Sequence, residues 1–324
     1  MSDRNNYESL AIGLSWIGYI WMAFIVLFFF SGLITDFSRL ILNVFAKIFG
    51  INLLAKIPKN IYFLLPLIFS ISLVVYGYFE ALNIKVERVI IHTNKINKNI
   101  RIIQISDVHI GLIIRESRIK RIAERIKQAN PDILISTGDL VDAQIDRLNH
   151  IADILREIEV PYGKFAITGN HEFYAGLKKA IAFTEKAGFE VLRDRGIRIE
   201  ELNLNIVGFD DSESKRYGLE LNIDRYLLLK NFSNSGFTLL LKHKPIIDRE
   251  LIDYFDLQLS GHTHKGQFFP FNIVTNLYYK SLDSGLVKLG GNAYLYISKG
   301  TGTWGPPIRI FAPPEITIIE LIKI

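Results

Sequence analysis

The sequence predicts an α/β protein in which two packed sheets, flanked by helices, follow an N-terminal transmembrane helical region. Three observations support this prediction: two long uncharged runs before residue 80, alternating strands and helices after residue 100, and a final series of strands separated by turns. Alternation of this kind is typical of sheets covered by helices. We therefore expect a membrane region, residues 1–80, and a second domain, residues 81–324.

Two segments, at about residues 10–30 and 61–79, are candidate transmembrane helices. Each is free of charged residues over about the 20 positions that a helix needs to cross the ~30 Å hydrocarbon core. The alternatives are a signal peptide and a buried core helix. The first run is too long for a signal peptide, and no small-residue cleavage site follows it. Pro66 interrupts the second run, but membrane helices tolerate proline.

The segment between these runs, residues 38–57, is amphipathic. Arg39, Asn43 and Lys47 are spaced four residues apart, so they share one helix face, and the remaining residues are mostly apolar. We expect a helix that lies in the plane of the membrane interface. A third crossing by this segment is the alternative, and it would invert the topology.

Charge and composition narrow the location and the partners. Lysines and arginines near the loop between the two helices roughly balance those on the flanks, so the positive-inside rule favours a cytoplasmic second domain only slightly. We expect a multi-pass protein of the cell membrane, in contact with membrane lipids. The net charge of +5 without a long basic run does not suggest nucleic acid. Nothing in the sequence implies an obligate protein partner, and the absence of cysteine excludes disulfides and thiolate metal sites.

The second domain reads as strands and helices in a regular order. A helix is expected at 115–130, with apolar residues at Ile119, Ile122, Ala123 and Ile126 and a stop at Pro131, and another at about 174–187. Strands are expected at 86–92, 100–106, 132–136, 163–168, 204–209, 237–242, 255–260, 293–298 and 316–322.

Five of these strands run into polar residues at their carboxyl ends, the edge of an α/β sheet where sites form. These residues are Asp107 and His109, then Asp139 and Asp142, then Asn170, His171 and Glu172, then His243, and finally His262 and His264. Alternate residues of an extended stretch point the same way, so Asp107 and His109 can reach one centre, as can His262 and His264. Any one motif would usually be only a turn or a strand end. Their joint occurrence, which uses five of the seven histidines, predicts a metal centre.

The residue types indicate which ions this centre would bind. Carboxylates and imidazoles without thiolates suit Mn²⁺, Fe or Zn²⁺ rather than Ca²⁺. The set is too large for one ion with an open position, and it fits two ions that share a bridging carboxylate.

At these residues the chain resembles the calcineurin-like metallophosphoesterases. Five blocks occur in the family's order: Asp-x-His, Gly-Asp-x-x-Asp, Gly-Asn-His-Glu, a lone His and Gly-His-x-His. The resemblance covers about residues 86–322 and is strongest to the membrane-anchored subgroup similar to YkuE. In that subgroup Gly-Gly-Gln commonly follows the last block, and Pro-x-Arg and Pro-Pro-Glu occur near the C-terminus. Here Lys265 replaces the first of those glycines, which adds a cation beside the site or only fills a turn position.

The resemblance implies a four-layer αββα sandwich and a role for each site residue. One metal ion is expected on Asp107, His109, Asp139 and His264, and the other on Asp139, Asn170, His243 and His262, with Asp139 as the bridge. His171 matches the family's catalytic histidine. Asp142 and Glu172 are expected to orient other groups through hydrogen bonds, and Lys265 to meet the incoming phosphate. The expected cofactors are two divalent metal ions, with Mn²⁺ first and Fe or Zn²⁺ as alternatives.

The expected function is a membrane-anchored phosphohydrolase or phosphodiesterase that cleaves a phosphoester or pyrophosphate bond with metal-activated hydroxide. The motifs do not distinguish diester, monoester and pyrophosphate substrates. A lipid-linked substrate such as UDP-2,3-diacylglucosamine is favoured only by the anchor and by an aromatic segment near the site. The alternative is a non-catalytic binding scaffold of the same fold at the membrane, although such scaffolds typically lose ligands. A metal-dependent amidohydrolase or deaminase would need an early His-x-His or a thiolate pair, which this sequence does not contain.

The aromatic segment, residues 267–280, has two interpretations. Its Phe and Tyr side chains either form the core of a strand pair or form a wall beside the metals that dips into the membrane interface. Aromatic rings with a polar tip are favoured at that interface. In the second interpretation a lipid presents its headgroup to the ions without leaving the bilayer.

Overall fold

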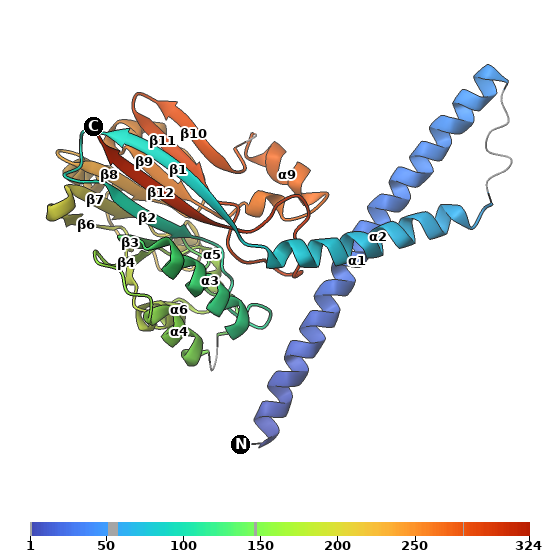
Figure 1. Ribbon diagram of the computed structural model, residues 1–324, viewed down its shortest axis with the longest axis horizontal. Helices are drawn as coiled ribbons and strands as arrows, with labels where there is room; N and C mark the ends of the chain where they lie inside the picture. The colour runs from blue at the N-terminus through green and yellow to red at the C-terminus, as the bar shows by residue number, and fades with distance from the viewer. Residues whose placement is uncertain (1, 51–57, 146–147, 281) are drawn as a thin grey trace.

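Two stacked six-stranded sheets form the centre of the described part of the chain (Figure 1). The computed structural model describes residues 2–50, 58–145, 148–280 and 282–324. The first sheet has the order β1-β12-β2-β3-β4-β5. Its strands are β1 (Lys85–Thr93), β2 (Ile100–Ile105), β3 (Ile133–Ser136), β4 (Lys164–Ala166), β5 (Glu190–Val191) and β12 (Glu315–Lys323). The second sheet has the order β10-β11-β9-β8-β7-β6. Its strands are β6 (Arg195–Ile199), β7 (Leu204–Gly208), β8 (Phe237–Leu241), β9 (Leu257–Ser260), β10 (Gly285–Gly290) and β11 (Ala293–Ile297).

Helices cover the outer face of each sheet. Those of the second domain are α3 (Glu116–Ala129), α4 (Asn149–Arg156), α5 (Asn170–Tyr174), α6 (Leu177–Lys186), α7 (Glu213–Arg216), α8 (Arg225–Phe232) and α9 (Phe271–Tyr278), with short 3₁₀ turns η2 (Glu200–Leu202), η3 (Arg249–Tyr254) and η4 (His264–Gly266). One apolar cluster joins α3, α4 and α6 to the first sheet. A second cluster fills the space between the sheets, and a third lies under α8 and η3. This order of layers confirms the four-layer αββα fold.

The helix predicted at 115–130 shows how local sequence produces one of these layers. Ile119, Ile122, Ala123 and Ile126 recur at helical spacing, and all four are buried against the first sheet. The helix ends at Asn130, whose left-handed backbone (φ 47°) precedes Pro131.

The N-terminal region consists of two antiparallel helices, α1 (Ser2–Phe49) and α2 (Ile61–Leu82), which we call the helical hairpin. Both are long and apolar enough to cross a membrane by length and composition. Their pairing is marked by a ring contact between Trp16 and Tyr78, a hydrogen bond between Ser31 and Ser70, and Arg39 over the ring of Tyr62.

The hairpin differs from the sequence prediction in one respect. Residues 38–49 continue α1 without a break rather than forming a separate helix, because neither proline nor glycine occurs between Gly32 and Gly50. Over 48 residues α1 is about 72 Å long, more than twice the thickness of a bilayer core. The remainder of the amphipathic segment, residues 51–57, lies outside the described residues. The in-plane placement of this segment stays a prediction.

The hairpin packs directly onto the sandwich where α2 ends (Figure 1). Ala23 and Leu27 of α1 are buried in one cluster with Phe268, Ile308 and Ile310. The predicted boundary at residue 80 falls in the last turn of α2, so apolar contacts cross it. An independent domain at 81–324 stays a prediction.

The aromatic segment does not form a strand pair, so that interpretation is wrong. Phe268 is buried against the hairpin, but residues 271–278 form α9, in which no residue is buried. Five of its large side chains are exposed: Phe271, Ile273, Val274, Leu277 and Tyr278. Phe271, Val274 and Leu277 follow each other at three-residue spacing, which suits a helix face rather than a strand face.

Candidate metal centre

The polar residues from the five strand ends meet at one edge of the sandwich. The parallel strands β2, β3 and β4 of the first sheet end there, as do the parallel strands β8 and β9 of the second. Two groups of potential ligand atoms result, and within each group the atoms lie within 4.8 Å of one another. Asp107, His109 and His264 make one group, and Asp139, His243 and His262 make the other. The two histidines of the Gly-His-x-His block therefore belong to different groups.

Five of these residues have a left-handed rather than an extended backbone, so their side chains do not converge through strand alternation as predicted. Asp107, His109, Asp139, His262 and His264 all have φ between 49° and 70°. Such backbone is costly for residues other than glycine and tends to cluster at functional sites. Each residue lies in the loop after a strand, two to four residues beyond the last residue of β2, β3 or β9.

Two glycines allow the loops to approach each other closely. A Cβ on Gly169 would overlap with Oδ1 of Asp139, and a Cβ on Gly261 would overlap with Ser106 and Oδ2 of Asp107. Only glycine fits these positions without a shift of the carboxylates.

The ligand atoms of the two groups face each other closely enough to bind cations between them. His109 Nε2 lies 3.1 Å from His264 Nε2, and His262 Nδ1 lies 3.2 Å from His243 Nε2. Asp139 Oδ2 lies 3.9 Å from Nε2 of His109 and 3.2 Å from Nε2 of His243. It therefore lies between the two groups. Asn170 Oδ1 is buried without a hydrogen-bond donor among the described residues. Facing nitrogens and an unpaired oxygen are what a bound cation would satisfy.

The pKa shifts of the site residues also favour metal binding. Burial lowers the pKa of His109 to about 4 and, helped by His243, that of His262 to about 3. Burial and then Arg309 hold the pKa of His264 well below its usual range. These rings are therefore neutral, the form that binds metal. Burial disfavours the charged forms of Asp139 and His243, but their mutual attraction outweighs it, lowering the pKa of Asp139 and raising that of His243.

His171 is held by Asp142 rather than by a facing imidazole. Asp142 Oδ1 lies 2.8 Å from Nδ1 of His171, which leaves Nε2 as the nitrogen available to a substrate. Burial favours the neutral ring, but the hydrogen bond to Asp142 and the charge of Asp139 outweigh it and raise the pKa of His171. A third possible ligand group joins these two residues with His109.

Glu172 orients backbone rather than ligand side chains. Its carboxylate accepts hydrogen bonds from the amides of Asp139 and Leu140 at 3.0 and 2.9 Å, and from the amide of Gly169 at 2.6 Å. It thereby ties the turn that carries Asp139 to the start of α5.

Arg309 holds His264, a role that the sequence analysis missed. Its side chain is fully buried, with Nη2 2.9 Å from Nδ1 of His264 and Nη1 donating to the carbonyl of the same residue at 2.9 Å. The signal in the sequence was a lone arginine within the apolar stretch "PPIRIFAPP". An arginine buried in such surroundings needs several acceptors.

A cavity of about 650 Å³ extends from this centre to the helical hairpin. His109, Asp139, Asn170 and His171 line one end of it, and Met22 and Val26 of α1 line the other. Phe268, Phe271, Tyr279 and Trp304 contribute to its walls. Lys265 is not among its lining residues; its left-handed backbone (φ 50°) lies in the turn η4. Its proposed contact with phosphate stays a prediction.

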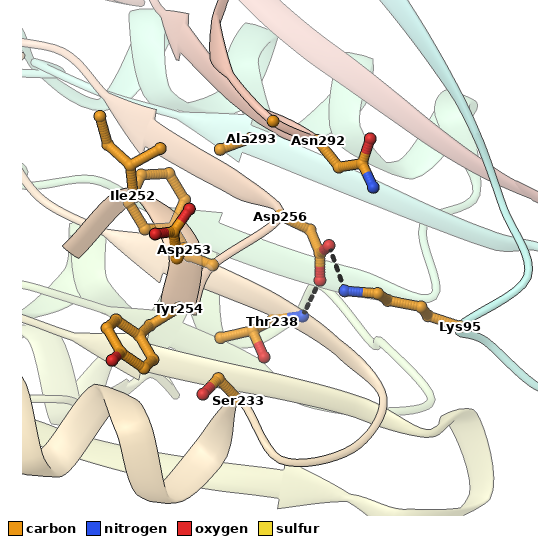
Figure 2. A pocket seen from close by; sticks show the side chains of 11 residues that line it. Lys95, Ser233, Thr238, Ile252, Asp253, Tyr254, Asp256, Asn292 and Ala293 are labelled. Atoms are coloured by element: carbon orange, nitrogen blue, oxygen red, sulfur yellow. Dashed lines mark hydrogen bonds and ion pairs between the residues drawn. The ribbon is translucent and has the colours of Figure 1, made fainter. Parts of the chain in front are cut away.

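A smaller hollow of about 270 Å³ lies at the opposite end of the strands, around the starts of β8, β9 and β11 (Figure 2). Asp256 binds the Nζ of Lys95 at 2.7 Å and the amide of Thr238 at 2.9 Å. The charges of Asp256 and Lys95 thus neutralise each other, and this hollow contains none of the three possible ligand groups found in the described part of the chain.

Comparison with known proteins agrees with the geometry. The family model for the calcineurin-like phosphoesterases matches residues 100–266. An uncharacterized metallophosphoesterase of Aquifex aeolicus is 41% identical over 255 residues, 78% of this chain and 97% of that protein. YkuE of Bacillus subtilis, also an uncharacterized metallophosphoesterase, is 32% identical over 68% of this chain and 78% of its own length. A Danio rerio transmembrane protein with metallophosphoesterase domain is 31% identical over 79% of this chain and 62% of its own length.

Proposed function

Because the chain belongs to the calcineurin-like phosphoesterases, and is thus a metal-dependent phosphoester hydrolase, we propose that its substrate is a lipid-linked phosphoester or pyrophosphate whose acyl chains stay in the membrane. The family uses a dinuclear divalent metal centre, and the two ligand groups here suit one. The expected occupants are two ions, Mn²⁺ or alternatively Fe or Zn²⁺.

The cavity is the observation that carries this proposal. It joins polar groups at the metal centre to Met22 and Val26, which lie within the uncharged run of α1. A soluble phosphoester needs no contact with such a helix. A lipid would place its phosphate at the polar end and its chain along the apolar end.

The surface around the cavity supports the same substrate class. Phe271 of α9 and Tyr279, directly after it, line the cavity, while Leu277 and Tyr278 are 73% and 76% exposed. Phe269, beside α9, contacts the ring of Phe30 in α1. This exposed apolar surface adjoins the hairpin, so it would lie in the interfacial region if α1 and α2 span the bilayer.

We assign the roles of the residues from the family's motifs, and the two ligand groups support this assignment. Asp107, His109, Asp139 and His264 would hold one ion, and Asp139, Asn170, His243 and His262 the other. Bound ions of this kind activate water and stabilise the charge of the phosphoryl oxygens. His171 keeps its Nδ1 on Asp142 and can donate the Nε2 proton to the departing oxygen, and its raised pKa favours the protonated ring that carries this proton.

The test uses the full chain in phospholipid vesicles loaded with Mn²⁺. Lipid pyrophosphates such as UDP-2,3-diacylglucosamine, lipid monoesters and a soluble nitrophenyl diester are offered, and products are identified by mass spectrometry. Val26→Trp should narrow the apolar end of the cavity and lower lipid turnover by about 10-fold or more, since overfilling costs about 1–3 kcal/mol. Turnover of the soluble diester should change little. Ile25→Trp, at an exposed neighbouring position, is the control.

The results distinguish a lipid substrate, a soluble substrate and a non-catalytic scaffold. Cleavage of the soluble diester alone would refute the lipid substrate. Bound metal without any turnover would favour the non-catalytic scaffold.

We also propose that α1 and α2 both cross the cell membrane and leave the sandwich in the cytoplasm. Two crossings by this hairpin would put the N-terminus and the sandwich on the same side of the membrane. Because the chain contains no cysteine, a single Lys178→Cys change at an exposed position reports on sidedness. An impermeant maleimide added to intact cells should leave it unlabelled, and labelling would reverse the orientation.

A further inference from the structure

The end of α2 touches the chain segment that carries Arg309. The carbonyl of Gly77 accepts a hydrogen bond of 2.8 Å from the amide of Arg309, and the side chain of Glu80 accepts one of 2.8 Å from the amide of Phe311. A Cβ on Gly77 would lie 3.0 Å from Ile310, 3.1 Å from the carbonyl of Arg309 and 3.1 Å from Ile308. A side chain at this position would therefore require these neighbours to shift by a few tenths of an ångström.

Arg309 connects this contact with the metal centre. Its guanidinium reaches the ring and the carbonyl of His264 at 2.9 Å each, and it also donates to the carbonyl of Lys299 at 2.7 Å. Because the side chain is fully buried and multiply bonded, a shift of its backbone would be passed on to the His264 ring.

Apolar packing holds the same segment from both sides. Ile308 and Ile310 flank Arg309 and are buried in one cluster with Ala23 and Leu27 of α1. The amide of Ile310 also donates to the carbonyl of Gln267, close to His264 in the chain. The segment is thus fixed between the hairpin and the loop of the metal ligand.

We propose that Gly77 of α2 is a positioning residue for His264 and acts through Arg309, so that the hairpin helps to build the metal centre besides anchoring it. This inference rests on the proposed role of His264 as a metal ligand. It does not depend on the nature of the substrate. In the described part of the chain, no hydrogen bond joins Asp139, His243 or His262 to α1, α2 or Arg309.

The test measures metal binding by the full chain in lipid nanodiscs, with Gly77→Leu as the principal variant. Calorimetric titration with Mn²⁺ and metal analysis should show one of two equivalents weakened by about 10–100-fold, as is usual when the support of a metal ligand is removed. The other equivalent should keep its wild-type affinity. Gly32→Leu in α1 is the matched control, because a Cβ there meets open space.

Two further variants make every result decisive. Gly77→Ala adds only the single close-packed carbon, so it should fold and weaken the same equivalent less. His264→Ala should remove that equivalent altogether. If His264→Ala keeps both equivalents, the proposed metal centre is wrong. If His264→Ala loses one but both Gly77 variants bind two ions as tightly as wild type, only the link through Arg309 is overturned. The Gly77→Ala result decides alone if Gly77→Leu does not fold.

Discussion

The two halves of the metal centre use the same kinds of residue but are supported by different parts of the molecule. In the half formed by Asp107, His109 and His264, the ring of His264 is held by Arg309, whose backbone contacts α2. In the half formed by Asp139, His243 and His262, the support comes from the strand ends themselves. His243 Nδ1, for example, lies 2.8 Å from the carbonyl of Thr137, directly after β3.

Because of this difference, we expect metal binding in the two halves to respond differently to changes in the hairpin. The second half depends on contacts within the sandwich, so changes in the hairpin should leave it intact. The first half depends also on a contact between α2 and the C-terminal segment. It should therefore respond to changes in the sandwich and to changes in the hairpin. Asp139 lies between the halves, so it should be the residue whose loss abolishes the distinction.

The largest effect is expected at Asp139. Asp139→Asn should weaken both ions, whereas Asp107→Asn should affect mainly one. Because bound ions contribute several kcal/mol of transition-state stabilisation, losing both corresponds to a fall in kcat/KM of about 10⁴-fold. Metal analysis of each variant beside turnover of a soluble diester checks this. Two retained equivalents with wild-type turnover in Asp139→Asn would show that the halves share no ligand.

The next effect separates chemistry from metal binding. His171→Ala should keep both ions and lose about 10³-fold in kcat, since a positioned acid typically contributes 10²–10⁴-fold. Asp142→Asn should lose less, because the ring remains in place without its carboxylate partner. Loss of a full metal equivalent in His171→Ala would instead make His171 a ligand.

A pair of glycine changes compares the halves directly. Gly261→Ala would push against Asp107, and Gly169→Ala against Asp139. We expect the first to weaken one ion and the second to weaken both, each by about 10–100-fold. Titration with Mn²⁺ distinguishes the patterns, and identical profiles for the two variants would contradict the division into halves.

The smallest effect is expected at α9, outside both halves. Leu277→Ser should leave metal binding and soluble-diester turnover unchanged. It should lower turnover of a lipid-linked substrate in vesicles by about 10-fold, since burial of a leucine contributes about 1.5–3 kcal/mol. Leu227→Ser, at an exposed position of α8 on the second sheet, is the control and should change neither activity. Equal lipid turnover in both variants would argue against a membrane contact of α9.

Much of the sandwich could be read directly from the sequence. The strands follow from short continuous apolar runs, and the buried face of α3 follows from apolar residues at helical spacing, both of which depend on near neighbours. The polar residues after the strands also identified the site, because the carboxyl ends of parallel strands meet at one edge of a sheet. α9 was ambiguous, since a short apolar run suits a strand or a helix until its surroundings are known.

By itself, the sequence determined the two apolar helices, most of the strands along the chain and the polar groups at the strand ends, but not β5, β6 or β10 or the order of strands in the sheets. Only the tertiary structure decided that Met22 and Val26 of α1 line the cavity, and that Gly77 contacts Arg309 and thereby His264. These contacts join residues far apart in the chain. They depend on how whole layers pack, and no local pattern of residue types specifies that packing.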